Sequence, residues 1–205
     1  MVLKHFYYIM KTSTGKLFEN TVENIFLASD RFSDNRLDKS FMNVFNYNDY
    51  IKYYVNDVID FETSIIKNEN DIFLFKNFPD DNEREKRGKT EFCVVQKTLK
   101  RLEIFRIECR FENVAGTAYQ KLNHAISSYR DFRHTSKETG YIIVYDGDYI
   151  LNNQSIINDV ITNIKHDFDI LFLNVIEFNN FLSDYLTIMD KSETFKKYCE
   201  LTKRI

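Results

Sequence analysis

The sequence predicts an α/β protein with a mixed central β-sheet flanked by helices on both faces. In the middle of the chain, β-type runs are separated first by short turns and then by helical segments, which favours antiparallel strands followed by parallel ones. One later run, YIIVY (141–145), is continuously apolar, as in a strand buried on both faces. With 205 residues and no linker-like stretch, we expect one domain over 1–205, with a core of about 13–175 and a C-terminal helical extension over 176–205.

The first half of the chain predicts two helices and two hairpins. Phe18, Val22 and Phe26 recur at helical spacing and predict a helix over residues 16–29, and a similar stripe predicts a helix over 48–60. Polar turn residues separate the β-type runs that follow. The predicted strands are 63–67, 71–75, 90–95 and 102–111.

The second half alternates helices and strands. A helix over 116–132 separates strand 102–111 from strand 140–146, which predicts a right-handed βαβ unit. The DGD sequence at 146–148 predicts a turn. The remaining predicted elements are a helix over 154–166, a strand over 170–175 and helices over 177–189 and 192–202.

Composition limits the classes of function. The net charge of -3 provides no overall attraction to nucleic acid, so any DNA contact must come from a local basic patch. Cys93, Cys109 and Cys199 lack the spacing of a zinc site and are typical of reduced core thiols. No apolar run is long enough to cross a membrane, and the N-terminus lacks a signal-peptide pattern, so we expect a soluble, cytoplasmic protein.

Acidic residues occur at two linked places in the second hairpin. Glu91 opens its first strand and Glu108 lies late in the partner strand, so the two carboxylates can lie side by side. A pair of carboxylates suits a hard divalent cation, which prefers oxygen ligands and keeps several waters. Arg110 shares a face with Glu108 and could bind a phosphate there. An ordinary ion pair at the end of a sheet is the alternative interpretation of Glu108 and Arg110.

Four segments together resemble the PD-(D/E)xK nuclease superfamily. IECRFE (107–112) resembles its apolar-Glu-x-Lys-x-Gln strand. GTAYQK (116–121) resembles the Gly-x-Ala-x-x-(Lys/Arg) helix opening of EcoRI-like type II restriction endonucleases. YIIVYDGD (141–148) is similar to the next core strand, and GKLFE (15–19) to the first helix, whose Glu sometimes joins the metal site. The resemblance covers roughly residues 13 to 175.

The resemblance implies a restriction-endonuclease-like fold and Mg²⁺-dependent cleavage of double-stranded DNA, with Mn²⁺ as a possible substitute. A homodimer would let one site cut each strand of a palindrome. Glu91 and Glu108 would bind the metal, with Glu19 as a further ligand, and Arg110 would stabilise charge on the phosphate. By position, the base-contacting residues would be Thr117, Gln120 and Lys121; Gln can pair with adenine and Lys with guanine.

Two residues depart from the family pattern. The first acidic residue is usually Asp, and we prefer Glu91 because it begins a strand paired with that of Glu108; Asp80, after Pro79, is the alternative. The motif Lys is Arg110 here, and because Arg stays protonated it cannot act as a general base. Water would then be activated by the metal. The same change is typical of a catalytically impaired nuclease-fold protein that binds DNA or another partner, which is the alternative function.

Overall fold

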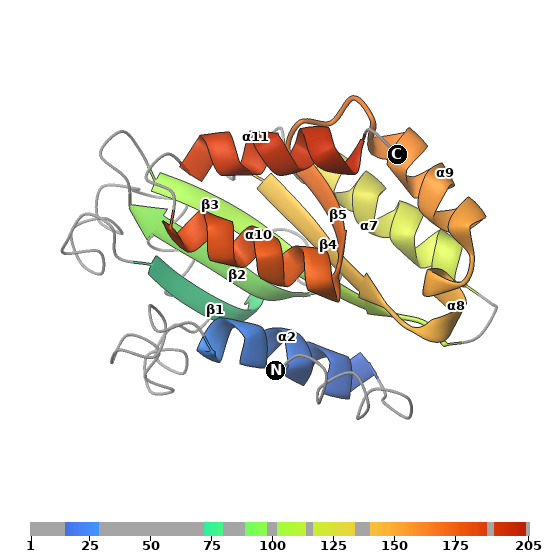
Figure 1. Ribbon diagram of the computed structural model, residues 1–205, viewed down its shortest axis with the longest axis horizontal. Helices are drawn as coiled ribbons and strands as arrows, with labels where there is room; N and C mark the ends of the chain where they lie inside the picture. Colours follow the sequence, from blue (N-terminus) through green and yellow to red (C-terminus); the bar gives the residue numbers. More distant parts are fainter. Residues whose placement is uncertain are drawn as a thin grey trace.

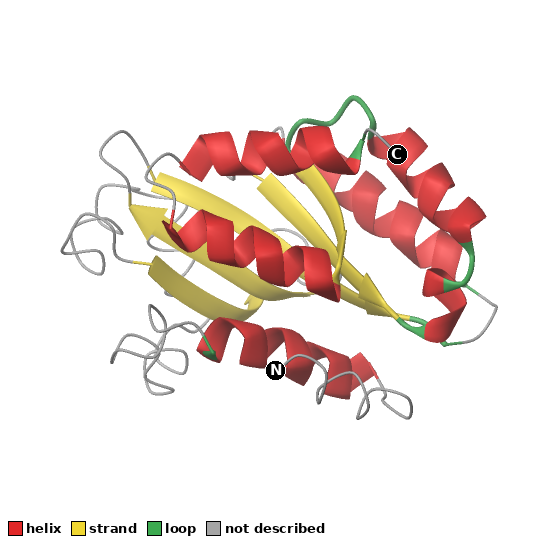
Figure 2. Ribbon diagram, in the orientation of Figure 1, coloured by secondary structure: helices red, strands yellow, loops and turns green. Residues whose placement is uncertain are grey.

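The computed structural model describes residues 15–28, 72–79, 89–97, 102–113, 117–133, 140–187 and 191–203. Within these residues a five-stranded sheet lies between two layers of helices (Figures 1 and 2). The spatial order of the strands is β1-β2-β3-β4-β5, the same as their order in the chain.

The sheet is mixed, as predicted. β1 (Ile72–Pro79), β2 (Lys89–Lys97) and β3 (Leu102–Phe111) pair antiparallel, and β4 (Gly140–Asp146) and β5 (Ile170–Asn174) run parallel to β3. β3 is therefore the central strand and the boundary between the two kinds of pairing. β1 extends four residues beyond the predicted strand 71–75, because its last residues continue to pair with the start of β2.

Six helices are described. α10 and α11 lie in front of the sheet in Figure 1, and α7 and α9 lie on its other side. The predicted helices over 16–29, 116–132 and 154–166 correspond closely to α2, α7 and α9. The short α8 was not predicted; it follows directly on the predicted turn at 146–148. The bounds are α2 (Gly15–Leu27), α7 (Ala118–Arg133), α8 (Asp148–Leu151), α9 (Gln154–Ile164), α10 (Val175–Thr187) and α11 (Lys191–Thr202).

Alternate residues of β4 face two separate cores. Ile142 and Val144 pack with apolar side chains of α2, α10 and α11, whereas Tyr141, Ile143 and Tyr145 pack with those of α7, α8 and α9. This alternation explains why the β4 sequence is continuously apolar, since both faces of the strand are covered. The segment 176–205 contributes to the first core, through Phe178, Phe181, Leu182 and Tyr198 among others.

α10 begins two residues before its predicted start because Asn174 caps it. The Asn174 side-chain oxygen accepts hydrogen bonds from the main-chain N–H groups of Ile176 and Glu177, and the Glu177 carboxylate accepts one from the N–H of Asn174. This reciprocal capping provides acceptors for main-chain N–H groups that have no partner within the helix. The predicted helix 48–60 and strand 63–67 lie outside the described residues, as does Asp80.

Candidate functional site

Glu91 and Glu108 lie at the point where the pairing of β2 with β3 ends. The register runs as far as Phe92 opposite Ile107, so the two glutamates are the next residue on each strand. The main-chain N–H of Cys109 donates a hydrogen bond of 2.9 Å to Glu91 Oε2. Glu91 is thus hydrogen-bonded to the strand that carries Glu108, one residue beyond Glu108 itself.

Glu108 and Arg110 form an ion pair on one face of β3. The side chains are 12% and 26% exposed, so water reaches the pair only in part. Arg110 Nε is buried and has no hydrogen-bond partner among the described residues. The guanidinium therefore balances the Glu108 charge while one of its donors stays unsatisfied. Because a buried donor without a partner costs free energy, an anion that reached Nε would gain from it.

Burial and nearby charges raise the pKa values of two groups at this site, the Glu91 carboxyl and the Cys109 thiol. Burial raises the pKa of Glu91 above its ordinary value, and nearby Glu19 adds to the effect, whereas the Cys109 N–H and Arg110 oppose it. Burial also raises the pKa of the Cys109 thiol, and Glu91, Glu108 and Glu19 raise it further. Carboxylates from α2, β2 and β3 thus all act electrostatically on Cys109, and Glu91 is the one that accepts a hydrogen bond from its N–H. Positive charge placed here would lower the electrostatic cost of keeping Glu91 ionised.

Arg110 supplies one such charge. Desolvation lowers the pKa of its guanidinium, but Glu108, Tyr141 and Glu91 outweigh that effect and raise the pKa overall. Arg110 is therefore a permanent cation in this site. It can bind and orient an anion, but it cannot accept a proton from water.

Glu19 reaches the site from α2. The ring of the preceding residue, Phe18, lies 5.6 Å from that of Phe111, which places the helix beside the end of β3. Glu19 forms a 2.9 Å ion pair with Lys16 one turn earlier. The carboxylate is thus close enough to Glu91 to raise its pKa, while its own direct partner is a helix neighbour.

The donor set fits a magnesium ion in kind. Mg²⁺ is commonly held by one or two carboxylates together with water and substrate phosphate, and Glu91 with Glu108 would supply the carboxylates. In the part of the chain that the structure describes, no group of three or more His, Cys, Asp or Glu side chains is arranged to hold a metal ion. Glu108 would have to exchange Arg110 for the cation.

The predicted DNA-contacting residues lie at the N-terminus of α7. Thr117 immediately precedes the helix, and its carbonyl accepts a 2.8 Å hydrogen bond from the Lys121 N–H. Thr117, Gln120 and Lys121 are all exposed. The Lys121 ammonium forms a 2.6 Å ion pair with Glu112, just beyond the end of β3. That ion pair connects the exposed helix end to the strand that carries Glu108 and Arg110.

Glu112 has a structural role that the sequence did not reveal. Its N–H donates to the Asp146 carbonyl at 3.1 Å, and its own carbonyl accepts from the Tyr149 N–H at 3.1 Å. Gly147 allows the backbone after β4 to lie this close to the backbone of Glu112, since a Cβ on Gly147 would lie 2.3 Å from the Glu112 carbonyl oxygen. The sequence offered two signals, the position of Glu112 two residues after Arg110 and its place at the end of the IECRFE segment.

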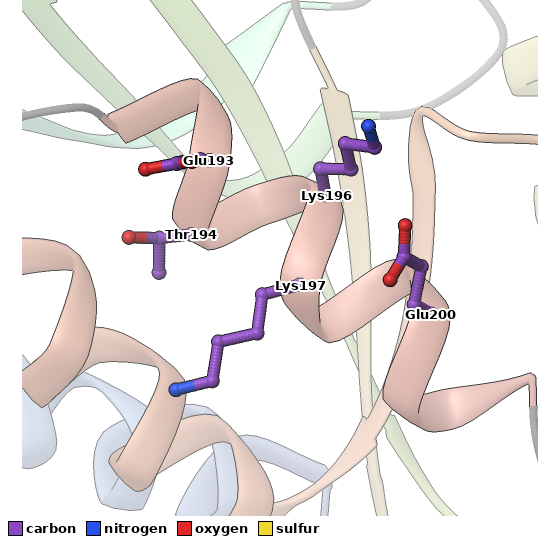
Figure 3. A pocket seen from close by; sticks show the side chains of 5 residues that line it. All are labelled: Glu193, Thr194, Lys196, Lys197 and Glu200. Atoms are coloured by element: carbon purple, nitrogen blue, oxygen red, sulfur yellow. The ribbon is translucent and has the colours of Figure 1, made fainter.

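A surface pocket of 360 Å³ lies along α11 and shares no lining residue with this site (Figure 3). Two glutamates, two lysines and one threonine line it. Glu193 with Lys197, and Lys196 with Glu200, have the i,i+4 spacing of a solvated helix face. The lining residues are Glu193, Thr194, Lys196, Lys197 and Glu200.

Comparison of the chain with family models, curated proteins and solved structures found no match. Among the described helices, none is both long enough and apolar enough to cross a membrane.

Proposed function

We propose that the chain is a Mg²⁺-dependent endonuclease that hydrolyses phosphodiester bonds in double-stranded DNA, of the PD-(D/E)xK type. Within that class, a cytoplasmic type II site-specific restriction enzyme acting as a homodimer is the most specific form of the proposal. The observation that carries it is that Glu91 and Glu108 are the next residues where the pairing of β2 with β3 ends, with Glu91 hydrogen-bonded to the Cys109 N–H and Arg110 paired to Glu108.

The order of elements supports the same proposal. The helix that carries Glu19, the β2–β3 hairpin, α7 and β4 follow one another in the order that the sequence resemblance requires. β3 and β4 pair in parallel, with α7 as the connection between them. The metal-binding carboxylates and the exposed start of α7 thus belong to consecutive elements, and the fold proposed is restriction-endonuclease-like.

Each residue has a defined role in the proposal. Glu91 and Glu108 bind the cation, with Glu19 as a further ligand. Arg110 donates hydrogen bonds to the oxygens of the scissile phosphate and stabilises the negative charge that develops on them. A bound Mg²⁺, or Mn²⁺ in its place, supplies Lewis-acid activation of water and phosphate. Arg110 acts as a phosphate-binding residue and not as a base.

DNA recognition is assigned to the start of α7. Gln120 can form two hydrogen bonds with adenine, and Lys121 can contact guanine, in the major groove. Thr117, at the helix N-terminus, adds a hydroxyl where the helix dipole favours phosphate. Lys121 would exchange Glu112 for the base, so its ion pair holds the ammonium in place before DNA binds.

A second candidate function is a catalytically impaired nuclease-fold protein that binds DNA or another partner. Arg110, in the place of the family's Lys, favours it, since the residue both neutralises Glu108 and is unable to act as a base. Cleavage that appears in Arg110→Lys from an inactive parent would support this candidate, and a parent that already cuts would exclude it.

The deciding experiment is incubation of the purified chain with plasmid and genomic DNA in Mg²⁺, compared with EDTA. Discrete fragments are expected. Glu108→Ala should lower the rate by at least about 100-fold, as loss of a group that acts in the transition state does. Glu193→Ala removes an exposed acidic residue of α11 and should leave cleavage unchanged. Activity that is unaffected by Glu108→Ala would overturn the site assignment.

A further inference from the structure

The Glu108–Arg110 ion pair joins the residue assigned to the cation with the residue assigned to the phosphate. Without ligands, each side chain neutralises the other. The cation needs the Glu108 carboxylate, and the phosphate needs the Arg110 guanidinium. Either ligand must therefore open the same ion pair before it can bind fully.

We propose that a divalent cation and a phosphodiester anion bind this site with positive cooperativity, because the opening of the Glu108–Arg110 pair is shared between them. The inference rests on the proposed function and deepens it, because it states how the binding of each ligand changes the affinity for the other. The free energy needed to separate the pair lowers the affinity of whichever ligand binds first. The second ligand then meets a partner that is already released.

The burial of the pair makes the coupling substantial. Both side chains are mostly shielded from water, so separating them without a replacement leaves two poorly solvated charges. When both ligands are present, Glu108 gains a cation and Arg110 gains an anion, so each side chain of the separated pair faces a charge of opposite sign.

The buried Nε of Arg110 adds a reason for the anion to bind. This donor has no partner in the described segments, so the guanidinium has hydrogen-bonding capacity that Glu108 does not use. A phosphate can accept two parallel hydrogen bonds from a guanidinium. Exchange of Glu108 for phosphate would thus satisfy a donor that the ion pair leaves open.

Cooperativity is measured as a change in cation affinity. Mg²⁺ is titrated into the full chain by calorimetry, in chloride and in dimethyl phosphate at equal ionic strength. Dimethyl phosphate should tighten Mg²⁺ binding by on the order of 10-fold, within the usual range of coupling between sites. Reciprocity requires Mg²⁺ to tighten dimethyl phosphate binding by the same factor. Equal Mg²⁺ affinity in the two buffers, or no Mg²⁺ binding in either, would overturn the proposal.

Variants distinguish the effect of the Glu108–Arg110 ion pair from the effect of the overall charge of the protein. Arg110→Gln should bind Mg²⁺ more tightly than the parent in chloride, since the guanidinium no longer competes with the cation for Glu108, and should lose the response to dimethyl phosphate. Glu108→Gln should bind dimethyl phosphate more tightly and Mg²⁺ more weakly. Lys197→Gln, which opens an exposed ion pair with Asp184, should keep the coupling of the parent. Weaker Mg²⁺ binding in Arg110→Gln, with the parent's circular dichroism spectrum, would contradict the inference.

The inference and the proposed function can fail independently. Cleavage that depends on Glu108, without any effect of dimethyl phosphate on Mg²⁺ affinity, would leave a nuclease and overturn the coupling. Coupling without cleavage would support the shared ion pair and overturn the nuclease activity.

Discussion

The main-chain N–H of Cys109 donates a 2.9 Å hydrogen bond to Glu91 Oε2, so a side chain of β2 satisfies the backbone of β3 where their pairing ends. Cys109 is buried, which makes this acceptor valuable. A donor left without a partner in such a place costs about 1 to 3 kcal/mol. Glu91 therefore has a structural role beside its proposed catalytic one.

We expect Glu91→Ala to be less stable than Glu91→Gln by about 1 to 3 kcal/mol, because Gln keeps a side-chain oxygen for the Cys109 N–H and Ala does not. Both variants remove the charge, so their difference isolates the hydrogen bond. Urea unfolding followed by circular dichroism measures it. Equal stability of the two variants would show that the N–H finds another acceptor.

The raised pKa of Glu91 predicts a particular dependence of stability on pH. The folded protein binds the Glu91 proton more tightly than the unfolded chain does, so this residue lowers stability as pH rises from its ordinary pKa of 4.5 through the raised value. Glu91→Gln removes that effect. The variant should be as stable as the parent at acidic pH and more stable at neutral pH.

Thermal unfolding at a series of pH values measures this difference, with Glu193→Gln as an exposed control that should follow the parent throughout. A parent that gains stability relative to Glu91→Gln as pH rises would contradict the expected sign.

Gly147 should tolerate no side chain. Its φ of 106° lies in the left-handed region, and a Cβ would lie 2.3 Å from the Glu112 carbonyl oxygen. Gly147→Ala should therefore cost about 2 kcal/mol or more in the free energy of unfolding. Gly15→Ala, where a Cβ would meet nothing within 4 Å, should be neutral or gain up to about 1 kcal/mol. Similar unfolding midpoints for the two variants would contradict the close approach of the Gly147 backbone to the Glu112 backbone.

Thr194 carries a buried hydroxyl without a hydrogen-bond partner in the described chain. Thr194→Val keeps the shape and removes this unsatisfied group, so we expect a gain of about 1 kcal/mol. Thr202→Val is the matched control, because the Thr202 hydroxyl donates to the Tyr198 carbonyl at 2.8 Å and its loss should cost about 1 kcal/mol. Changes of the same sign in denaturant unfolding would argue against this difference between the two threonines.

Much of the fold followed from local patterns. The apolar run of β4 and the helical spacing of Phe18, Val22 and Phe26 depend on side chains near in sequence, so their elements were predicted within one or two residues. The capping of α10 was also readable, since Asn174 and Glu177 stand three residues apart, but the predicted start at 177 overlooked it.

The contacts of the site could not be predicted in the same way. The pairing of β2 with β3 followed from the hairpin, yet the bond from the Cys109 N–H depends on where the two strands separate. The ion pair of Lys121 with Glu112 depends on how α7 leaves the end of β3. Such features arise from tertiary geometry, which residue spacing does not encode. The identity of the chemistry stays a prediction for the cleavage experiment.

The strand order of the sheet has a consequence for the synthesis of the protein. Because each strand pairs with the one made just before it, the sheet can grow at a single edge as the chain leaves the ribosome. No strand from β1 to β5 has to enter between two existing neighbours. In the antiparallel part, from β1 to β3, this pairing keeps loop closures short, which favours rapid folding, whereas each parallel pairing first requires a helical crossover.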